Sequence, residues 1–232
     1  RSEEVKEGVI DAFVTGPIDK STMHGESFPF TGHTEYLTHE FQATESLMLM
    51  TGQDLRVGLV TEHVALRDVP DLISKERVEL KIRLMELSLK KDFNISKPKI
   101  AVLGLNPHAG DDGLIGAEEN TIIRPVITDL KHKGKLIFGP FPADGFFAAG
   151  QHKKYDGIIA MYHDQGLIPF KSLAFDTGVN FTAGLPVIRT SPDHGTAYNI
   201  AGKNLADESS MRQAIYLAAD IIKHRSMQLA EN

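Results

Sequence analysis

Residues 157–171 read GIIAMYHDQGLIPFK, and this stretch decides which fold the chain can adopt. The apolar run from Ile158 to Met161 has the length and composition of a buried strand. It ends abruptly in a histidine and a carboxylate, His163 and Asp164. Such an ending has two interpretations: the chain is simply leaving the core, or the strand delivers chemical groups to the rim of a sheet. The other strand ends bear on that choice.

Short apolar runs alternate with amphipathic segments along the whole chain. Strands are expected at residues 11–16, 46–51, 56–61, 98–105, 135–140, 157–162 and 186–191, and helices near 34–43, 71–91, 118–133 and 207–228. The turn residues at 52–54 predict a hairpin between the second and third strands. This alternation predicts an α/β fold with a mostly parallel sheet and one antiparallel pair.

Composition narrows the class of protein. The 232 residues are 41% hydrophobic and 24% charged, which is typical of a globular protein with one large domain or two small ones. A net charge of −6 disfavours nucleic acid as a partner, and no apolar run approaches the roughly 20 residues of a membrane span. The charged opening RSEEVKEG does not resemble a secretion signal, so we expect a cytoplasmic protein. Because cysteine is absent, a transition metal would need histidine and carboxylate ligands.

Three of the expected strands finish in a histidine. The stretches RVGLVTEH, KIAVLGLNPH and GIIAMYH end at His63, His108 and His163. Ligands of open α/β sheets gather outside the carboxyl ends of the strands, so parallel neighbours would bring these imidazoles to one rim. Three neutral imidazoles form the ligand set of a catalytic divalent metal, although each histidine taken alone is more often an ordinary surface residue.

Other polar residues have a structural and a functional interpretation. Thr34 stands where a helix is expected to begin, so it is either an N-cap or a ligand contact beside His33. Asp164 either caps the turn that follows the strand or orients His163. Lys171 and Arg189 lie in mostly apolar surroundings, where a cation needs a partner or a bound anion. With Asn180 between them, they predict a phosphate or carboxylate clamp.

Eight stretches together resemble the 4-hydroxythreonine-4-phosphate dehydrogenase family of pyridoxal phosphate biosynthesis. They are VTGPIDK, PFTGHTEYL, HVALRDV, GLNPHAGDDGLIGAEE, GPFPAD, AMYHDQGLIPFK, GVNFTAGLPVIRTSPDHGTA and AGKNLADESS, and they run from about residue 12 to 210. The resemblance implies NAD-dependent oxidation of 4-phosphohydroxy-L-threonine with loss of CO₂, which gives 3-amino-2-oxopropyl phosphate.

The resemblance also implies roles for particular residues. A divalent metal (Zn, Mg or Co) would be held by His63, His108 and His163, and the phosphorylated substrate by His33, Thr34, Lys171, Asn180 and Arg189. Lys171 and Asp164 are the candidates for proton transfer or for orienting the site. The nicotinamide cofactor, NAD with NADP as the alternative, would lie along His194, Gly195, Thr196 and Asp207. Members are homodimers that share active-site residues across the interface.

The implied fold is that of the isocitrate and isopropylmalate dehydrogenases, with two α/β/α domains and a cleft between them, and it is not a Rossmann fold. Residues 25–165 would form a substrate, metal and dimerisation domain, and residues 1–24 with 166–232 would belong to the cofactor domain. Family members carry a longer segment before the VTGP strand, so we expect part of the cofactor domain to be missing from this chain.

Three alternatives remain open. Enzymes of the same family that act on 4-phospho-D-threonate or 4-phospho-erythronate would use the same metal and phosphate residues. A metal-dependent hydrolase would need the three histidines and a water molecule but no NAD. An inactive fragment would bind metal and phosphate without turnover.

Overall fold

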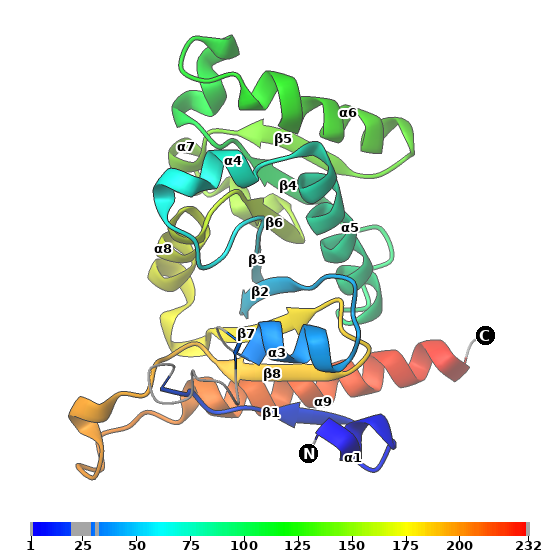
Figure 1. Cartoon of the computed structure of the whole chain (residues 1–232), viewed down its shortest axis with the longest axis vertical. Coiled ribbons are helices and arrows are strands. Elements are labelled where there is room, and N and C mark those ends of the chain that lie inside the picture. Colours follow the sequence, from blue (N-terminus) through cyan, green and yellow to red (C-terminus); the bar gives the residue numbers. More distant parts are fainter. Residues whose placement is uncertain (1, 20–28, 31–32, 231–232) are drawn as a thin grey trace.

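One eight-stranded sheet runs through the whole protein, as the computed structural model shows for residues 2–19, 29–30 and 33–230 (Figure 1). The strand order is β1-β8-β7-β2-β3-β6-β4-β5. The strands are β1 (Ala12–Val14), β2 (Leu47–Gly52), β3 (Leu55–Leu59), β4 (Ile100–Leu103), β5 (Ile137–Phe141), β6 (Gly157–Ala160), β7 (Val179–Ala183) and β8 (Ile188–Pro192). Most of their residues are buried because helices cover both faces of the sheet.

The helices form the outer two layers of an α/β/α arrangement. They are α1 (Ser2–Lys6), α3 (His33–Glu40), α4 (Val69–Leu72), α5 (Lys75–Lys91), α6 (Arg124–His132), α7 (Ala143–Ala148), α8 (His163–Ala174) and α9 (Ser209–Ala230). Helices α5, α6 and α9 pack on one face, where Leu47 and Leu49 of β2 point; α7 and α8 pack on the other, where Met48 and Met50 point. Because successive side chains of β2 point to opposite faces of the sheet, this strand contributes residues to two separate cores.

The sheet differs from the expected one by one strand. β7, which the sequence did not reveal, is antiparallel to both β2 and β8, and the predicted β2–β3 hairpin supplies a third antiparallel pair. Only one antiparallel pair was predicted, and that count was wrong because the segment 179–183 was taken as a connection. The mixed α/β class was correct. The predicted domain boundary at 24/25 lies outside the described residues, and the two-domain division stays a prediction.

Helix α8 is a second feature that the sequence did not reveal. The turn-like residues of the HDQG stretch open a 12-residue helix that also contains Pro169. Gly166 explains the close packing of this helix: a Cβ there would lie 2.8 Å from Leu59 Cδ2 and 2.9 Å from Val57 Cγ1. Glycine therefore lets the first turn of α8 rest directly on β3.

Helix α5 matches its prediction most closely. Its buried stripe contains Val78, Ile82, Met85 and Leu89, as the period indicated. The Ser74 hydroxyl caps the helix by accepting the Arg77 N–H at 3.2 Å, a contact worth about 1 kcal/mol. The expected helix at 71–91 is in fact two helices, α4 and α5, because the chain is extended at Ile73 and Ser74. None of the described helices has both the length and the apolar content needed to cross a bilayer.

Candidate active site

The three strands that precede the histidines are neighbours and parallel. β6 lies between β3 and β4 and pairs with both in the parallel sense. His63, His163 and His108 therefore follow the carboxyl ends of adjacent strands, which confirms the predicted strand arrangement. The edge where an α/β sheet most often binds its ligand thus carries three imidazoles.

His63 and His163 lie side by side at this edge. Their ring centroids are 5.6 Å apart, with an angle of 46° between the planes. Asp164 Oδ1 lies 2.7 Å from His163 Nδ1, so this carboxylate orients the ring and leaves Nε2 for a ligand. Metal-bound histidines typically have such a carboxylate partner on their second nitrogen. The structure therefore favours the orienting interpretation of Asp164, and no side-chain cap bond is made at the start of α8.

His108 lies in an exposed loop with an unusual backbone. Residues 108–112 all have positive φ, from 44° to 82°, and only one of them is glycine. The buried Glu119 carboxylate holds the start of this loop by accepting the Asn106 backbone N–H at 2.7 Å. Gln165 of α8 in turn donates to the Gly104 carbonyl at 2.6 Å and accepts from the Met161 N–H at 2.7 Å. A hydrogen bond from Gln165 therefore connects the segment that carries His163 to the segment that carries His108.

Histidine is a suitable donor for a divalent metal, and the oriented His163 beside His63 fits that role. Among the described residues, however, no group of three or more His, Cys, Asp or Glu side chains is close enough to hold one ion. Within this one chain, His108 does not complete the set. The three-histidine metal site consequently stays a prediction.

A cavity of about 740 Å³ opens beside the histidine pair. Its walls come from α3, from β7 and β8, from the residues after β3, and from the first turns of α5. Eight predicted site residues line it: His33, Thr34, His63, Lys171, Asn180, Arg189, His194 and Gly195. His108, His163, Asp164, Thr196 and Asp207 are not among the lining residues. Every predicted substrate residue thus reaches one cavity.

Arg189 is the most unusual of these residues. Arg189 is only 4% exposed. Its guanidinium nevertheless donates hydrogen bonds to neutral hydroxyls: to Thr15 Oγ1 at 2.7 and 3.0 Å and to Thr182 Oγ1 at 3.2 Å. Among the described residues no carboxylate forms an ion pair with it. Burial lowers its pKa to about 10, which still leaves the group charged at neutral pH. A buried cation without a described counter-ion, beside a cavity, has the properties expected of an anion-binding group, and this role of Arg189 stays a prediction.

Two further predicted substrate residues line the same cavity. The Asn180 Oδ1 atom is buried and has no hydrogen-bond partner in the described part of the chain. Lys171 Nζ lies 3.3 Å from Asp193 Oδ1, and burial raises the pKa of the Asp193 carboxyl. Lys171 is therefore placed by an acidic residue that the sequence prediction overlooked.

His33 is held in its neutral form. Burial and, to a smaller extent, the charge of Arg189 lower its pKa from 6.5 to about 4. At neutral pH the ring can therefore donate one hydrogen bond and accept another. The adjacent Thr34 lies in the first turn of α3 and lines the cavity, which favours a ligand contact over the N-cap alternative.

The lowered pKa of His33 predicts a pH dependence of stability. In the unfolded chain the His33 ring takes up a proton near pH 6.5, whereas in the folded protein it does so only near pH 4. The free energy of unfolding therefore decreases as the pH drops between these values. We expect His33→Asn to flatten this part of the curve. Urea unfolding of both proteins at pH 7.5 and pH 4.5 measures the difference, and parallel losses of stability in the two proteins would contradict the assignment.

Only two of the four predicted cofactor residues line the cavity. His194 and Gly195 reach the cavity, whereas Asp207 caps the start of α9 by accepting the Ser209 N–H at 2.7 Å. Its bond to Ser209 also lowers the pKa of the exposed Asp207 carboxyl. The segment between β8 and α9 projects from the body of the protein (Figure 1). A structural role explains Asp207 fully, and its cofactor role stays a prediction.

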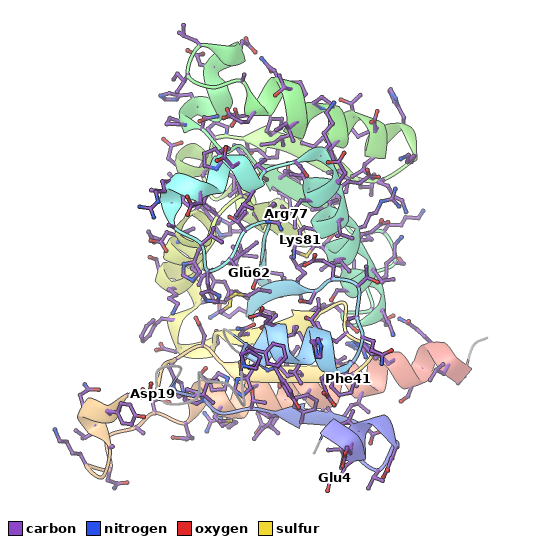
Figure 2. The ribbon with its side chains drawn as sticks, in the orientation of Figure 1. Glu4, Asp19, Phe41, Glu62, Arg77 and Lys81 are labelled. Atoms are coloured by element: carbon purple, nitrogen blue, oxygen red, sulfur yellow. The ribbon has the colours of Figure 1, made fainter. Side chains whose placement is uncertain are left out.

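The cavity also contains charged residues that the sequence prediction missed. Glu62, Arg77 and Lys81 all line the cavity, and Figure 2 shows these three side chains close together. Burial raises the pKa of Glu62, and the nearby charge of Lys81 partly offsets this effect. Lys81 was detectable in principle, because a lysine inside the apolar stripe of a helix must have a partner. Glu62 and Arg77 were not, because their proximity depends on how α5 packs on the sheet.

Comparison with known proteins identifies the family. A model of the family described as "Pyridoxal phosphate biosynthetic protein PdxA" matches residues 2–218. The chain belongs to this family. A protein of Bacteroides thetaiotaomicron named 4-hydroxythreonine-4-phosphate dehydrogenase is 52% identical over 98% of this chain and 63% of its own length.

Solved structures agree. The crystal structure of a 4-hydroxythreonine-4-phosphate dehydrogenase from Klebsiella pneumoniae superimposes with a TM-score of 0.84 at 41% identity, over 95% of this chain and 66% of that one. A β-decarboxylating dehydrogenase from Thermococcus kodakarensis, 16% identical, has the same fold at a TM-score of 0.54, over 97% of this chain and 69% of that one. The chain spans 63% and 66% of the length of the first two curated relatives it matches.

Proposed function

We propose that the protein acts in pyridoxal 5′-phosphate biosynthesis as an NAD-dependent dehydrogenase, which oxidises and decarboxylates 4-phosphohydroxy-L-threonine to 3-amino-2-oxopropyl phosphate. Membership of the family and the names of its relatives support the reaction. The observation that carries the proposal is Arg189, a buried cation on the cavity wall that has no carboxylate partner among the residues the structure describes. A phosphate monoester supplies the missing negative charge.

Phosphate recognition follows from the groups around Arg189. The guanidinium presents a planar set of donors that matches phosphate geometry. Lys171 adds a second cation, and neutral His33 adds a ring N–H without repelling Arg189 further. The first turn of α3, at Thr34, also favours an anion through the helix dipole. These groups fix the substrate at one end and leave its C3 hydroxyl to be directed towards the histidines.

The chemistry needs groups beyond the chain itself. A divalent metal held by His63, His108 and His163 would lower the pKa of the C3 hydroxyl, and NAD⁺ would accept a hydride from C3. The chain's own task is then to hold the substrate, to orient His163 through Asp164, and to move protons. Loss of CO₂ leaves the C1–C2 electron pair on C2, which must gain a proton. Lys171, paired with Asp193, is the proposed donor.

A homodimer with a shared site is part of the proposal. Single-chain geometry brings His63 and His163 together without completing a three-ligand group among the described residues. Exposed apolar side chains follow the same strand ends: Leu66 is 69% exposed, Leu114 is 83% exposed and Ile168 is 64% exposed. Large exposed apolar residues that surround a site suggest a subunit interface. We propose that a second copy covers this edge and that each site draws histidines from both copies.

The rival functions differ in substrate and in the need for NAD⁺. Purified full-length protein should form NADH from 4-phosphohydroxy-L-threonine, with a kcat/KM well above that for 4-phospho-D-threonate or 4-phospho-erythronate. A higher kcat/KM for either hydroxy acid would transfer the proposal to that alternative. Turnover without NAD⁺ would indicate a hydrolase, and metal and phosphate binding without turnover would indicate a binding fragment.

A further inference from the structure

The cavity contains a second pair of cations, in addition to those of the phosphate clamp. Arg77 and Lys81 stand one turn apart on α5, and both line the cavity. Figure 2 shows them close to Glu62, in the region where α5 passes the end of β3. Neither residue has a part in the proposed recognition of phosphate.

The two cations of this pair differ in their partners. Lys81 is 4% exposed, and its Nζ lies 2.9 Å from Glu45 Oε1 and 2.5 Å from the Ser46 carbonyl oxygen. Its charge is therefore neutralised within the protein. Arg77 is half-buried, and its guanidinium makes no hydrogen bond or ion pair with any residue in the described part of the chain. Of the two, only Arg77 can offer its full donor set to a ligand.

The places of Arg189 and of the wall near Glu62 in the strand order suggest what kind of ligand fits the cavity. Arg189 belongs to β8, and the wall near Glu62 follows β3, which is three strands away in the order β8-β7-β2-β3. Three strand spacings correspond to roughly 14 Å between backbones, and side chains from both ends reach into this space. Two cations supplied to one cavity by elements this far apart in the sheet order suit a short ligand with an anion at each end.

We propose that Arg77 binds the carboxylate of the substrate while Arg189 binds its phosphate. This inference rests on the proposed function and adds to it a subsite for C1. A guanidinium forms two parallel hydrogen bonds with a carboxylate, which favours an acid over a ligand of the same length without one. The group bound by Arg77 is the one that leaves as CO₂, so the product keeps the Arg189 contacts and loses the Arg77 contact. Product release is thereby eased.

Two unreactive compounds isolate this contact. O-phospho-L-homoserine is the substrate without its C3 hydroxyl, and 3-aminopropyl phosphate is the same molecule without the carboxylate. Calorimetry on the full-length protein should show tighter binding of O-phospho-L-homoserine. We expect Arg77→Gln to weaken that binding about 10- to 100-fold, the effect of losing a charged hydrogen-bonded pair, and to leave 3-aminopropyl phosphate within about twofold. Circular dichroism checks that the variant is folded.

Arg83→Gln is the matched control. Arg83 stands on the same helix, is exposed, and pairs with Glu79 outside the cavity, so its loss removes the same charge without touching the subsite. Equal affinity of the wild type for the two compounds, absence of binding by either, or equal weakening of both by Arg77→Gln would overturn the inference. If the Arg77-dependent preference is found but 4-phosphohydroxy-L-threonine is not turned over, the proposed function fails and the carboxylate subsite stands.

Discussion

Replacing His163 with alanine is expected to remove the divalent metal from the protein. His163 is oriented by Asp164 and stands against His63, so it supplies the best-placed donor of the proposed site. Loss of a residue that only orients a ligand typically weakens metal binding 10- to 100-fold, and loss of the ligand itself should weaken it by more than about 100-fold. Elemental analysis after dialysis measures the metal per chain, and NADH formation should disappear with it.

Two matched variants make this result interpretable. His132→Ala removes an exposed histidine from the last turn of α6, outside the cavity, and should retain the wild-type metal content. Asp164→Asn keeps the ligand but loses the charge that orients it, so its metal affinity should lie between those of the wild type and His163→Ala. Wild-type metal content in His163→Ala would remove this histidine from the site.

Replacing Arg189 with glutamine is expected to weaken phosphate recognition strongly. The guanidinium is the only buried cation in the described cavity wall that lacks an acidic partner, so glutamine removes the charge that balances the phosphate. Removing one member of a buried charged pair costs 2 kcal/mol or more, so KM should rise by at least about 30-fold. Steady-state kinetics with the phosphorylated substrate measures this rise.

Thermal unfolding provides an independent measure of the same contact. Inorganic phosphate should raise the Tm of the wild type, because it binds the folded state, and should leave the Tm of Arg189→Gln unchanged. The ligand-free variant should remain folded, since glutamine can still donate to Thr15 and relieves the cost of an unpaired buried charge. An unchanged KM together with an undiminished phosphate effect on Tm would exclude Arg189 from the clamp.

The strand-end histidines were predictable because short continuous apolar runs and their polar endings are local features of the sequence. The order β3-β6-β4, with its parallel pairing, then placed His63, His163 and His108 at one edge. β7 was not predictable in the same way. Its residues include Asn180 and Thr182, and glycines stand on both sides, so the local pattern indicates a connection. The strand forms because two neighbours, β2 and β8, offer it hydrogen bonds.

Helix α8 was also not predictable from the local sequence, because tertiary packing decides its conformation. Gly166 and Pro169 lower the intrinsic helix propensity of its segment, and packing on β3 overrides that cost. The candidate site depends equally on tertiary structure. Pairing of Lys171 with Asp193, and placement of Arg77 and Glu62 on the cavity wall, arise between elements distant in sequence. Sequence alone identifies which residues are chemically suitable; the sheet order determines which of them meet.

We propose that this site oxidises and decarboxylates a phosphorylated amino acid. Turnover of 4-phosphohydroxy-L-threonine labelled with ¹³C at the carboxyl carbon tests it most directly, with NADH and labelled CO₂ measured in the same reaction. Full-length protein supplied with NAD⁺ and a divalent metal should release one labelled CO₂ for each NADH formed. NADH without labelled CO₂, or inorganic phosphate released in the absence of NAD⁺, would contradict the account.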